Sequence, residues 1–265
     1  MFLSQQYPLS KNEIQKNLIT NAKIITVKEC GSTNTALKEM AESGGTEWTL
    51  FCAEKQTKGK GRMNNSFFSP KTGIYMSILL RPDFSAENSL FITTLAGCAV
   101  CRAIENKTGK SAKIKWVNDL YTDSGKICGI LAESAIDFEK NKIKYSVLGI
   151  GVNLFPPKCG FPDDILRKAA SLYNEEIPDK NIKNILIAEI FNEFYKLYKD
   201  FNKKEHIKEY KKRSMLIGRN IVYTMNDKEY CAMVTDIDDE CRLVLINDKN
   251  ETVKLSSGEV KIRQW

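Results

Sequence analysis

Apolar residues recur along the chain in two patterns, one typical of strands and the other of helices. Short apolar runs rich in β-branched residues predict strands over residues 22–30, 47–56, 73–82, 113–121, 125–134 and 143–153. Helical spacing predicts helices over 11–19, between residues 32 and 44, over 86–107 and over 180–212. The order of these elements favours an α+β protein with one mixed sheet and helices packed against it.

Capping residues mark the ends of two of the helices. Residues 32–34 are all good N-cap types, and Gly44 is a stop signal for the helix that they begin. Ser85 and Gly109 flank the predicted helix 86–107 in the same way. The long amphipathic segment 180–212 has a lysine-rich polar face.

The pattern of apolar and turn residues changes after Arg213. The runs "IGRNIVYTM", "EYCAMVTDI", "RLVLIND" and "ETVKLSS" predict short strands separated by turn residues. About fifty residues of that pattern are typical of a small barrel-like domain. The sequence therefore predicts two domains, a larger one over residues 1–213 and a smaller one over residues 214–265.

Composition restricts the function classes. The chain has 265 residues, and its 40 basic against 33 acidic residues give a net charge of +7. The excess suits an anionic ligand or an acidic partner, but it is dispersed and falls short of what is typical of nucleic-acid binders. No apolar run approaches the roughly 20 residues that cross a bilayer, so the sequence predicts a soluble protein without a membrane partner.

The eight cysteines do not indicate disulfides. Cys52, Cys98, Cys101, Cys128 and Cys231 lie in apolar runs with no signal peptide before them, which predicts buried reduced thiols in a cytoplasmic protein. The C-x-x-C of Cys98 and Cys101 lies in an apolar helix with no second pair, which favours packing over a zinc site.

A basic run joins two buried strands. It reads "EKQTKGKGRMNNSFFSP" over residues 54–70 and is predicted to be a loop, and its central residues, 57–68, are named the basic loop below. Gly59 and Gly61 alternate with Lys60 and Arg62, so that amide donors and cations converge on one anion, a phosphate or a carboxylate. The run matches neither a P-loop nor a dinucleotide motif, so a solvated basic loop without a ligand is the alternative to an anion-binding loop.

Three further runs place polar or charged side chains beside buried strands. "KIKWVNDLY" holds Asn118 and Asp119, and Asp119 suits a cation or a basic neighbour, although a simple Asn/Asp turn explains the same letters. In "GKICGILAES", Lys126 precedes an apolar strand that contains Gly129. "LGIGVNLFPP" repeats the pattern with two glycines and Asn153. Glycine inside a strand indicates that another group approaches closely.

Together these runs resemble the catalytic domain of biotin protein ligases. The matching pieces are "GSTN", "EKQTKGKGR", "SP" with "GIYMSILLRP", "KWVNDLY", "GKICGILAE" and "GIGVNL", and the ending "SSGEVKIR" is similar to the closing strand of that family. The resemblance implies a fold like class II aminoacyl-tRNA synthetases followed by an SH3-like β-barrel. It also implies a two-step reaction: biotin and MgATP give biotinyl-5′-AMP and pyrophosphate, and a carrier lysine then takes the biotin.

The resemblance assigns roles to individual residues. It implies that the residues binding biotin are Ser32, Thr33, Asn34, Gln56, Gly59, Lys60, Gly61, Arg62, Lys126 and Gly129. It implies that the residues binding ATP are Lys60, Gly61, Arg62, Phe67, Asn118, Asp119, Lys126, Asn153 and Ser171. Asn153 and Asp119 would hold Mg²⁺, and Lys126, Arg62 and Asp119 would be catalytic. Helix capping by Ser32 remains a compatible reading of the first group.

The sequence also departs from the family at the basic loop. Lys60 stands where arginine is commoner, and a lysine lacks the bidentate fork of arginine. Asn64 and Asn65 replace the usual Gly-Arg, Phe67 replaces tryptophan, and Val117 replaces proline. These changes predict a looser grip on the adenylate.

Alternatives and partners follow from the same residues. A lipoate or octanoate ligase shares the chemistry but not the polar array, and a biotin-binding module would lack catalysis. A biotin-responsive repressor needs a helix-turn-helix domain, and the two dozen residues before "GSTN" are too few for one, which predicts a ligase without DNA binding.

The expected partner is a biotin carboxyl carrier domain, and the protein is expected as a monomer or homodimer. We also expect a surface position for the single histidine, His206, and a basic loop that is disordered when empty.

Overall fold

The computed structural model describes residues 7–137, 139–174, 179–225, 228–258 and 260–262. A seven-stranded sheet forms its centre, in the order β1-β2-β3-β7-β6-β5-β4, with β1 and β2 parallel and all other neighbours antiparallel. The strands are β1 (Lys23–Cys30), β2 (Thr49–Gln56), β3 (Ile74–Leu80), β4 (Lys113–Lys115), β5 (Asp119–Thr122), β6 (Gly125–Asp137) and β7 (Lys142–Val152). The predicted mixed sheet is confirmed.

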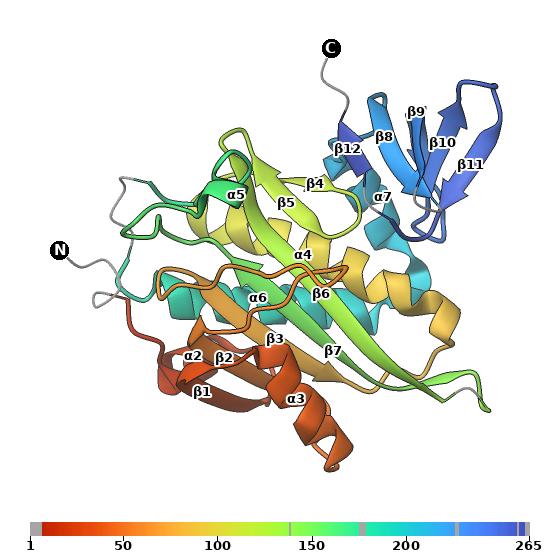
Figure 1. Ribbon diagram of the computed structural model, residues 1–265. Coiled ribbons are helices and arrows are strands. Elements are labelled where there is room, and N and C mark those ends of the chain that lie inside the picture. The colour runs from red at the N-terminus through yellow and green to blue at the C-terminus, as the bar shows by residue number, and fades with distance from the viewer. Residues whose placement is uncertain (1–6, 138, 175–178, 226–227, 259, 263–265) are drawn as a thin grey trace.

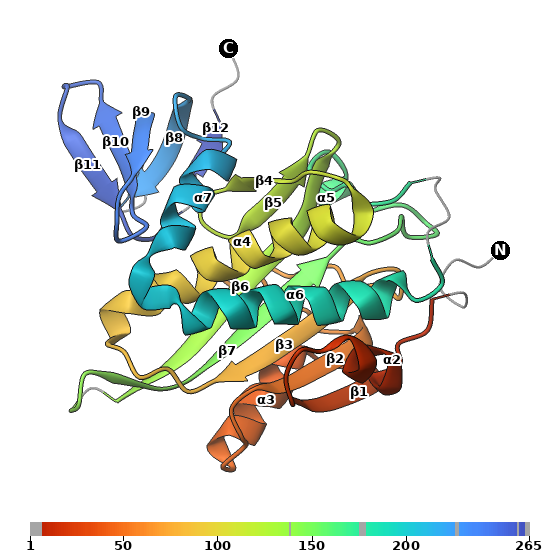
Figure 2. The ribbon, with the colours of Figure 1, turned by 180° about the vertical axis from the view of Figure 1, so that it is seen from behind.

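Helices cover both faces of this sheet. On one face lies α3 (Thr33–Glu42), whose buried Leu37 and Ala41 pack on Phe51, Leu79 and Val147. The other face is covered by α4 (Ser89–Thr108) and α6 (Ile182–Lys199), with α2 (Lys11–Asn17) beside α6 and β1 (Figure 2). The basic loop crosses the α3 face of the sheet over β6 and β7 (Figure 1). The basic loop therefore lies on the face of the sheet opposite α4 and α6.

The C-terminal strands form a second, five-stranded antiparallel sheet in the order β11-β10-β9-β8-β12. These are β8 (Asn220–Met225), β9 (Lys228–Ile237), β10 (Leu243–Asn247), β11 (Thr252–Leu255) and β12 (Val260–Ile262). The sheet lies beside the β4–β5 hairpin (Figure 1). Its buried residues, such as Val234 and Leu245, belong to the same apolar cluster as α4 and α6. The predicted boundary after residue 213 stays a prediction.

Two predicted elements are each divided in the structure. The segment 113–121 is the β4–β5 hairpin, because Trp116, Val117 and Asn118 form a turn instead of continuing the strand. The segment 180–212 contains α6, a short 3₁₀ turn (Phe201–Lys203) and α7 (Glu205–Arg213), which are separated at Lys204, whose φ is 52°. The remaining helices are α5 (Asp163–Leu166) and the 3₁₀ turn Ala86–Asn88 ahead of α4.

The surface position expected for His206 is wrong. His206 is 3% exposed, and its ring meets the Phe91 ring edge-on with centroids 5.7 Å apart. Burial lowers the pKa of His206 to about 4, against the opposing charge of Glu209. The residue is a neutral core histidine of α7 that packs against α4.

The cysteines follow the prediction with one exception. None of the eight forms a disulfide, and Cys52, Cys98, Cys101 and Cys128 are buried, but Cys231 is only half-buried because it lies on the outer face of β9. In the described part of the chain no three cysteine, histidine or acidic side chains gather as metal ligands. No helix in that part is long and apolar enough to cross a membrane.

Candidate active site

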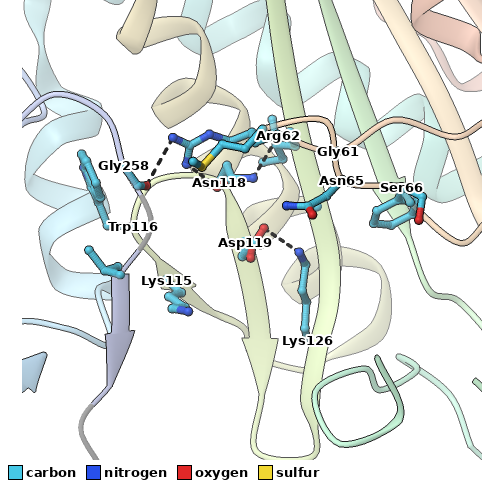
Figure 3. Close-up of a pocket in the computed structure, with 15 residues that line it drawn as sticks. Gly61, Arg62, Asn65, Ser66, Lys115, Trp116, Asn118, Asp119, Lys126 and Gly258 are labelled. Atoms are coloured by element: carbon cyan, nitrogen blue, oxygen red, sulfur yellow. Dashed lines mark hydrogen bonds and ion pairs between the residues drawn. The ribbon is translucent and has the colours of Figure 1, made fainter. Parts of the chain in front are cut away.

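Lys126 and Asp119 face each other across the β5–β6 hairpin. The Lys126 Nζ atom lies 2.8 Å from the Asp119 Oδ1 atom, and the two side chains are 28% and 21% exposed (Figure 3). That oxygen is buried and accepts no well-directed hydrogen bond among the described residues, so charge attraction alone holds the pair. The pair lines a cavity of about 170 Å³ that Gly61, Arg62 and Phe67 also line. An anionic ligand there would compete with Asp119 for the ammonium group.

Neighbouring segments fix the backbone of Lys126. Its N–H donates to the Lys168 carbonyl at 2.7 Å, and its carbonyl accepts from the Ala170 N–H at 2.8 Å. Burial raises the pKa of the neighbouring Tyr121 to about 12, and the Asp119 carboxylate adds to that shift. Tyr121 is therefore protonated at neutral pH and is not a base for the site. Burial likewise raises the pKa of the Cys128 thiol and keeps it neutral.

Arg62 reaches from the basic loop to the same cavity. Its guanidinium donates to the Asn118 Oδ1 atom at 3.0 Å and to the Gly258 carbonyl at 3.4 Å (Figure 3). Asn118 is held in turn by Ile130, whose carbonyl accepts from Asn118 Nδ2 at 3.1 Å. The C-terminal sheet thus supplies one wall of the site. Glu259 and Arg263 of "SSGEVKIR" lie outside the described residues.

The basic loop is shaped by its own backbone. The Gly61 N–H donates to the Asn65 carbonyl at 2.7 Å, and the Phe67 N–H donates to the Gly59 carbonyl at 2.9 Å. A Cβ atom at Gly59 would lie 2.3 Å from the Phe67 carbonyl oxygen, so only glycine fits this position. Lys60 is exposed and lines an adjoining groove with Glu133, not the cavity of Lys126.

Three of the residues predicted to bind biotin, Thr33, Asn34 and Gln56, belong to one hydrogen-bonded group at the start of α3. The Thr33 N–H and hydroxyl both donate to Gln56 Oε1, at 2.8 and 3.1 Å. Gln56 Nε2 donates to the Ser69 hydroxyl at 2.9 Å. Ser32 is the N-cap residue of α3, but its side chain makes no capping hydrogen bond. Its hydroxyl therefore does not serve the capping role that the sequence left open.

Asn34 and two residues that the sequence did not single out complete this group. The buried Ser77 hydroxyl lies 2.6 Å from Asn34 Oδ1 and 2.7 Å from Thr33 Oγ1. Asn34 Nδ2 donates to Glu133 Oε2 at 2.8 Å and to the Leu131 carbonyl at 3.2 Å. Thr33, Asn34, Gln56, Ser77 and Glu133 are together the polar cluster. Both amide protons of Asn34 are used within the protein.

The polar cluster has more acceptors than donors. Ser77 has one hydroxyl proton for two acceptor atoms, on Thr33 and Asn34, because the proton of Thr33 is directed to Gln56. Glu133, which also accepts from Lys38 Nζ at 3.0 Å, is held ionised. Burial raises the pKa of Glu133, but the hydrogen bonds from Asn34 and Lys38 outweigh it and leave that pKa below its usual value. The cluster therefore suits a ligand that brings N–H donors.

Three glycines of β6 and β7 give the site a floor without side chains. A Cβ atom at Gly151 would lie 2.4 Å from the Phe67 ring, and one at Gly129 would lie 2.9 Å from it. At Gly149 the corresponding atom would lie 2.2 Å from Asn34 Oδ1. The close approach expected from strand glycines is confirmed, and in this structure the approaching groups are Phe67 and Asn34.

Asn153 and Ser171 lie beside the backbone of Lys126 and are not among the residues that line the cavity. The Asn153 N–H donates to the Ile127 carbonyl at 2.8 Å, and its Nδ2 donates to the Lys126 carbonyl at 3.3 Å. The Leu172 N–H donates to the Asn153 carbonyl at 2.8 Å, which places the segment around Ser171 beside it. The Ser171 hydroxyl is buried and has no hydrogen-bond partner among the described residues. Such a group is typical of a ligand site.

The fold and the site are those of a two-part α+β protein with a cationic pocket, and two family models that match the chain give its family. The model of the biotin/lipoate A/B protein ligase family matches residues 27–153, and the model of the biotin protein ligase C-terminal domain matches residues 216–263. The two matches together span well over half of the chain. The chain belongs to the biotin/lipoate A/B protein ligase family, in its biotin protein ligase branch.

Individual relatives agree with this assignment. A biotin–[acetyl-CoA-carboxylase] ligase of Mycobacterium tuberculosis is 28% identical over 267 residues, which cover 96% of this chain and 95% of that protein. The bifunctional ligase/repressor BirA of Bacillus subtilis is 34% identical over 197 residues, but this match spans 73% of this chain and 60% of that protein. The biotin protein ligase of Aquifex aeolicus in complex with biotin and ATP superposes with a TM-score of 0.74 at 24% identity, covering 92% of this chain and 99% of that one. That likeness shows a shared fold.

Proposed function

We propose that this protein is a biotin protein ligase that activates biotin with MgATP and transfers it to a lysine of a biotin carboxyl carrier domain. The observation that carries the proposal is the position of the Lys126 ammonium group, which lines one cavity with Arg62 and Asn118 beside a glycine floor. Family membership supports it. Each step of the reaction places a demand on these side chains.

Recognition of biotin begins at the polar cluster. The ureido head of biotin carries two N–H donors and one carbonyl acceptor, and the cluster has an acceptor in excess. Ser32 would donate to the carbonyl, while Thr33 and Gln56 would accept from the ring. An unpaired polar group in such a site costs about 1–3 kcal/mol, which discriminates against lipoate, whose dithiolane ring has no N–H group. The apolar chain of biotin would lie along Gly129, which requires the Phe67 ring to move aside.

Activation joins two anions, the biotin carboxylate and the α-phosphate. Lys126 would leave Asp119 and bridge both groups, so that their mutual repulsion is offset where charge develops. Arg62 would bind the polyphosphate with its fork, and Lys60 would add charge from the groove side. The N–H group of Gly61 and the narrow approach at Gly59 would bring the backbone of the basic loop onto the acyl phosphate.

The nucleotide would lie between Asn118 and Ser171. The buried Ser171 hydroxyl, which has no hydrogen-bond partner among the described residues, would form a hydrogen bond with the adenine. Phe67 would stack on the adenine once its ring has left the glycine floor. Mg²⁺ would suit the side-chain oxygen atoms of Asp119 and Asn153, because Asp119 Oδ1 is buried without a well-directed hydrogen bond and the described hydrogen bond of the Asn153 side chain uses its nitrogen, Nδ2. Bound Mg²⁺ would neutralise charge on the phosphates.

Transfer requires an uncharged lysine amine from the carrier. Asp119 is the carboxylate beside the reacting carbonyl once Lys126 has turned to the ligand, and it would accept the proton of the attacking amine. The only histidine is buried away from the site, which leaves the carboxylate as the base. We also propose a cytoplasmic location, because thiols such as the eight of this chain stay reduced there.

Mass spectrometry of a carrier domain tests the proposal. With biotin and MgATP, wild-type protein should add one biotin to the carrier lysine, whereas Lys126→Ala should reduce the rate by about three orders of magnitude because the repelling anions lose their bridge. Lys113→Ala is the matched control, since Lys113 is an exposed lysine on β4, in the same sheet as Lys126. Full activity of Lys126→Ala, or transfer of lipoate in place of biotin, would overturn the proposal.

A further inference from the structure

The N-terminal arm, residues 7–19, is fastened to α6 at both ends by buried asparagine side chains. Asn184 Nδ2 donates to the Pro8 carbonyl at 2.9 Å, and the Ser10 N–H donates to Asn184 Oδ1 at 2.9 Å. Eight residues further along α6, Asn192 makes the same pair of bonds, with the Asn17 carbonyl at 2.8 Å and the Ile19 N–H at 3.0 Å. The two side chains are buried, which makes each of these backbone pairings costly to lose.

At the first residue of the arm, an aromatic ring packs behind the site. Tyr7 is 1% exposed, and its ring centroid lies 4.5 Å from that of Phe155. Phe155 packs in turn against Tyr173, with centroids 5.7 Å apart and an angle of 29° between the ring planes. The three rings pack in one row, and interiors packed at the usual density resist displacement of any one ring.

This stack is joined directly to Asn153 and Ser171. Phe155 follows Asn153 by two residues, and Tyr173 follows Ser171 by two residues. The two short segments are also bonded to each other, because the Leu172 N–H donates to the Asn153 carbonyl at 2.8 Å and the Tyr173 N–H donates to the Leu154 carbonyl at 2.9 Å. A shift of the rings therefore moves both side chains at once.

We infer that the N-terminal arm is part of the nucleotide site and that Tyr7 is a positioning residue for Asn153 and Ser171. The inference rests on the proposed function, in which these two side chains face ATP. The arm precedes residues 27–153, the part of the chain matched by the family model. Tyr7 holds the Phe155–Tyr173 pair from behind, and Asn184 holds Tyr7 in place. Among the described residues no hydrogen bond or ring contact joins the polar cluster to this stack, so the inference predicts an effect on ATP binding and none on biotin binding.

Two asparagine variants form a matched pair for the test. Asn184→Ala and Asn192→Ala each remove one buried amide with two bonds to the arm, but only Asn184 lies at the end that carries Tyr7. The readout is biotin-dependent ATP–pyrophosphate exchange, with the KM for ATP, the KM for biotin and kcat determined separately, and with Tm for stability. We expect both variants to lose Tm similarly, and Asn184→Ala alone to raise the KM for ATP about tenfold, the order of effect of a displaced binding group.

Tyr7 variants address the ring itself. Tyr7→Leu keeps the site apolar but removes the stack, and it should raise the KM for ATP while leaving the KM for biotin unchanged. Tyr7→Phe retains the ring and should behave like wild type. If Asn184→Ala does not fold, this second pair still decides the question.

The outcomes separate the inference from the function on which it rests. The inference alone would be overturned if the wild type catalyses exchange but the KM for ATP is equal in Asn184→Ala and Asn192→Ala. An equal KM for ATP in Tyr7→Leu and Tyr7→Phe would overturn it in the same way. Equal increases in the KM values for ATP and biotin would also count against it, because they indicate a general structural loss. Absence of exchange by the wild-type protein would overturn the proposed function first.

Discussion

The polar cluster and the basic loop belong to one site, but they are built in opposite ways. Within the cluster Thr33, Asn34 and Ser77 are buried and Gln56 and Glu133 are half-buried, and short hydrogen bonds among them and from Lys38 exist without a ligand. The basic loop is exposed over most of its length, and its described hydrogen bonds are mainly within its own backbone. A prebuilt cluster gives recognition, whereas a loop of glycines and charges gives closure over a ligand.

Arg62→Ala should produce the largest effect on the loop side of this comparison. The guanidinium is the loop cation that lines the cavity of Lys126, so its loss should reduce kcat/KM for ATP by about 10²-fold. Pyrophosphate exchange measures this. The KM for biotin should change far less, because the described hydrogen bonds of Arg62 go to Asn118 and Gly258 and not to the polar cluster. A loss restricted to biotin binding would contradict the division between the two regions.

Ser77→Ala is the corresponding change in the polar cluster. It removes the donor shared by Thr33 and Asn34 and should cost about 1–3 kcal/mol of unfolding free energy, measured by denaturant titration. The KM for biotin should rise about tenfold and the KM for ATP should stay constant, following the cost of an unpaired group. Ser134→Ala is the control, since it loses a hydroxyl contact with Ser146 at 3.0 Å outside the cluster. Equal effects of the two variants would show that the cluster is only structural.

Lys60→Ala should have a smaller effect than Arg62→Ala. Lys60 is exposed and lies in the adjoining groove, where solvent screens its charge, so the predicted loss in kcat/KM for ATP is about fivefold. The effect should shrink further as salt is added. Lys60→Arg should slow release of the adenylate, measured by filtration, because arginine gains a bidentate grip. Faster release from Lys60→Arg would argue against a phosphate contact at this position.

Acid should change stability without acting through either region. His206 has a folded pKa of about 4 against an ordinary value of 6.5, so the unfolded chain binds more protons between these values. Stability should therefore rise as pH increases from 4 to 6.5, by up to about 3 kcal/mol. Denaturant titrations of wild type and His206→Phe should diverge in this window and run parallel above it. Parallel curves throughout would show that His206 titrates normally.

The two regions also differ in how far the sequence predicts them. The strands, α3 and the glycine floor follow from local patterns, since apolar runs, capping residues and strand glycines act over a few residues. Ser77 and Glu133 were missed because their partners on α3 are 43 and 99 residues away, and a lone serine or glutamate in a strand gives no local signal.

The errors in the C-terminal half have the same origin. His206 is buried by Phe91 and Thr94 of α4, which the lysine-rich neighbours in sequence do not indicate. The apolar spacing of 180–212 continues through Phe201 and Ile207, although packing against α4 turns the chain at Lys204. The assignments of individual residues to biotin, ATP and Mg²⁺ stay predictions, because they depend on where the ligands bind.

Trypsin cleavage in the basic loop tests the contrast between the two regions most directly. Lys58, Lys60 and Arg62 supply exposed or half-buried cleavage sites, and the amount of cleavage is followed by mass spectrometry with no ligand, with biotin alone, and with biotin plus MgATP. If the cluster is prebuilt and the loop closes on the adenylate, biotin plus MgATP should protect the loop strongly. Cleavage at the same rate in all three samples would contradict the account.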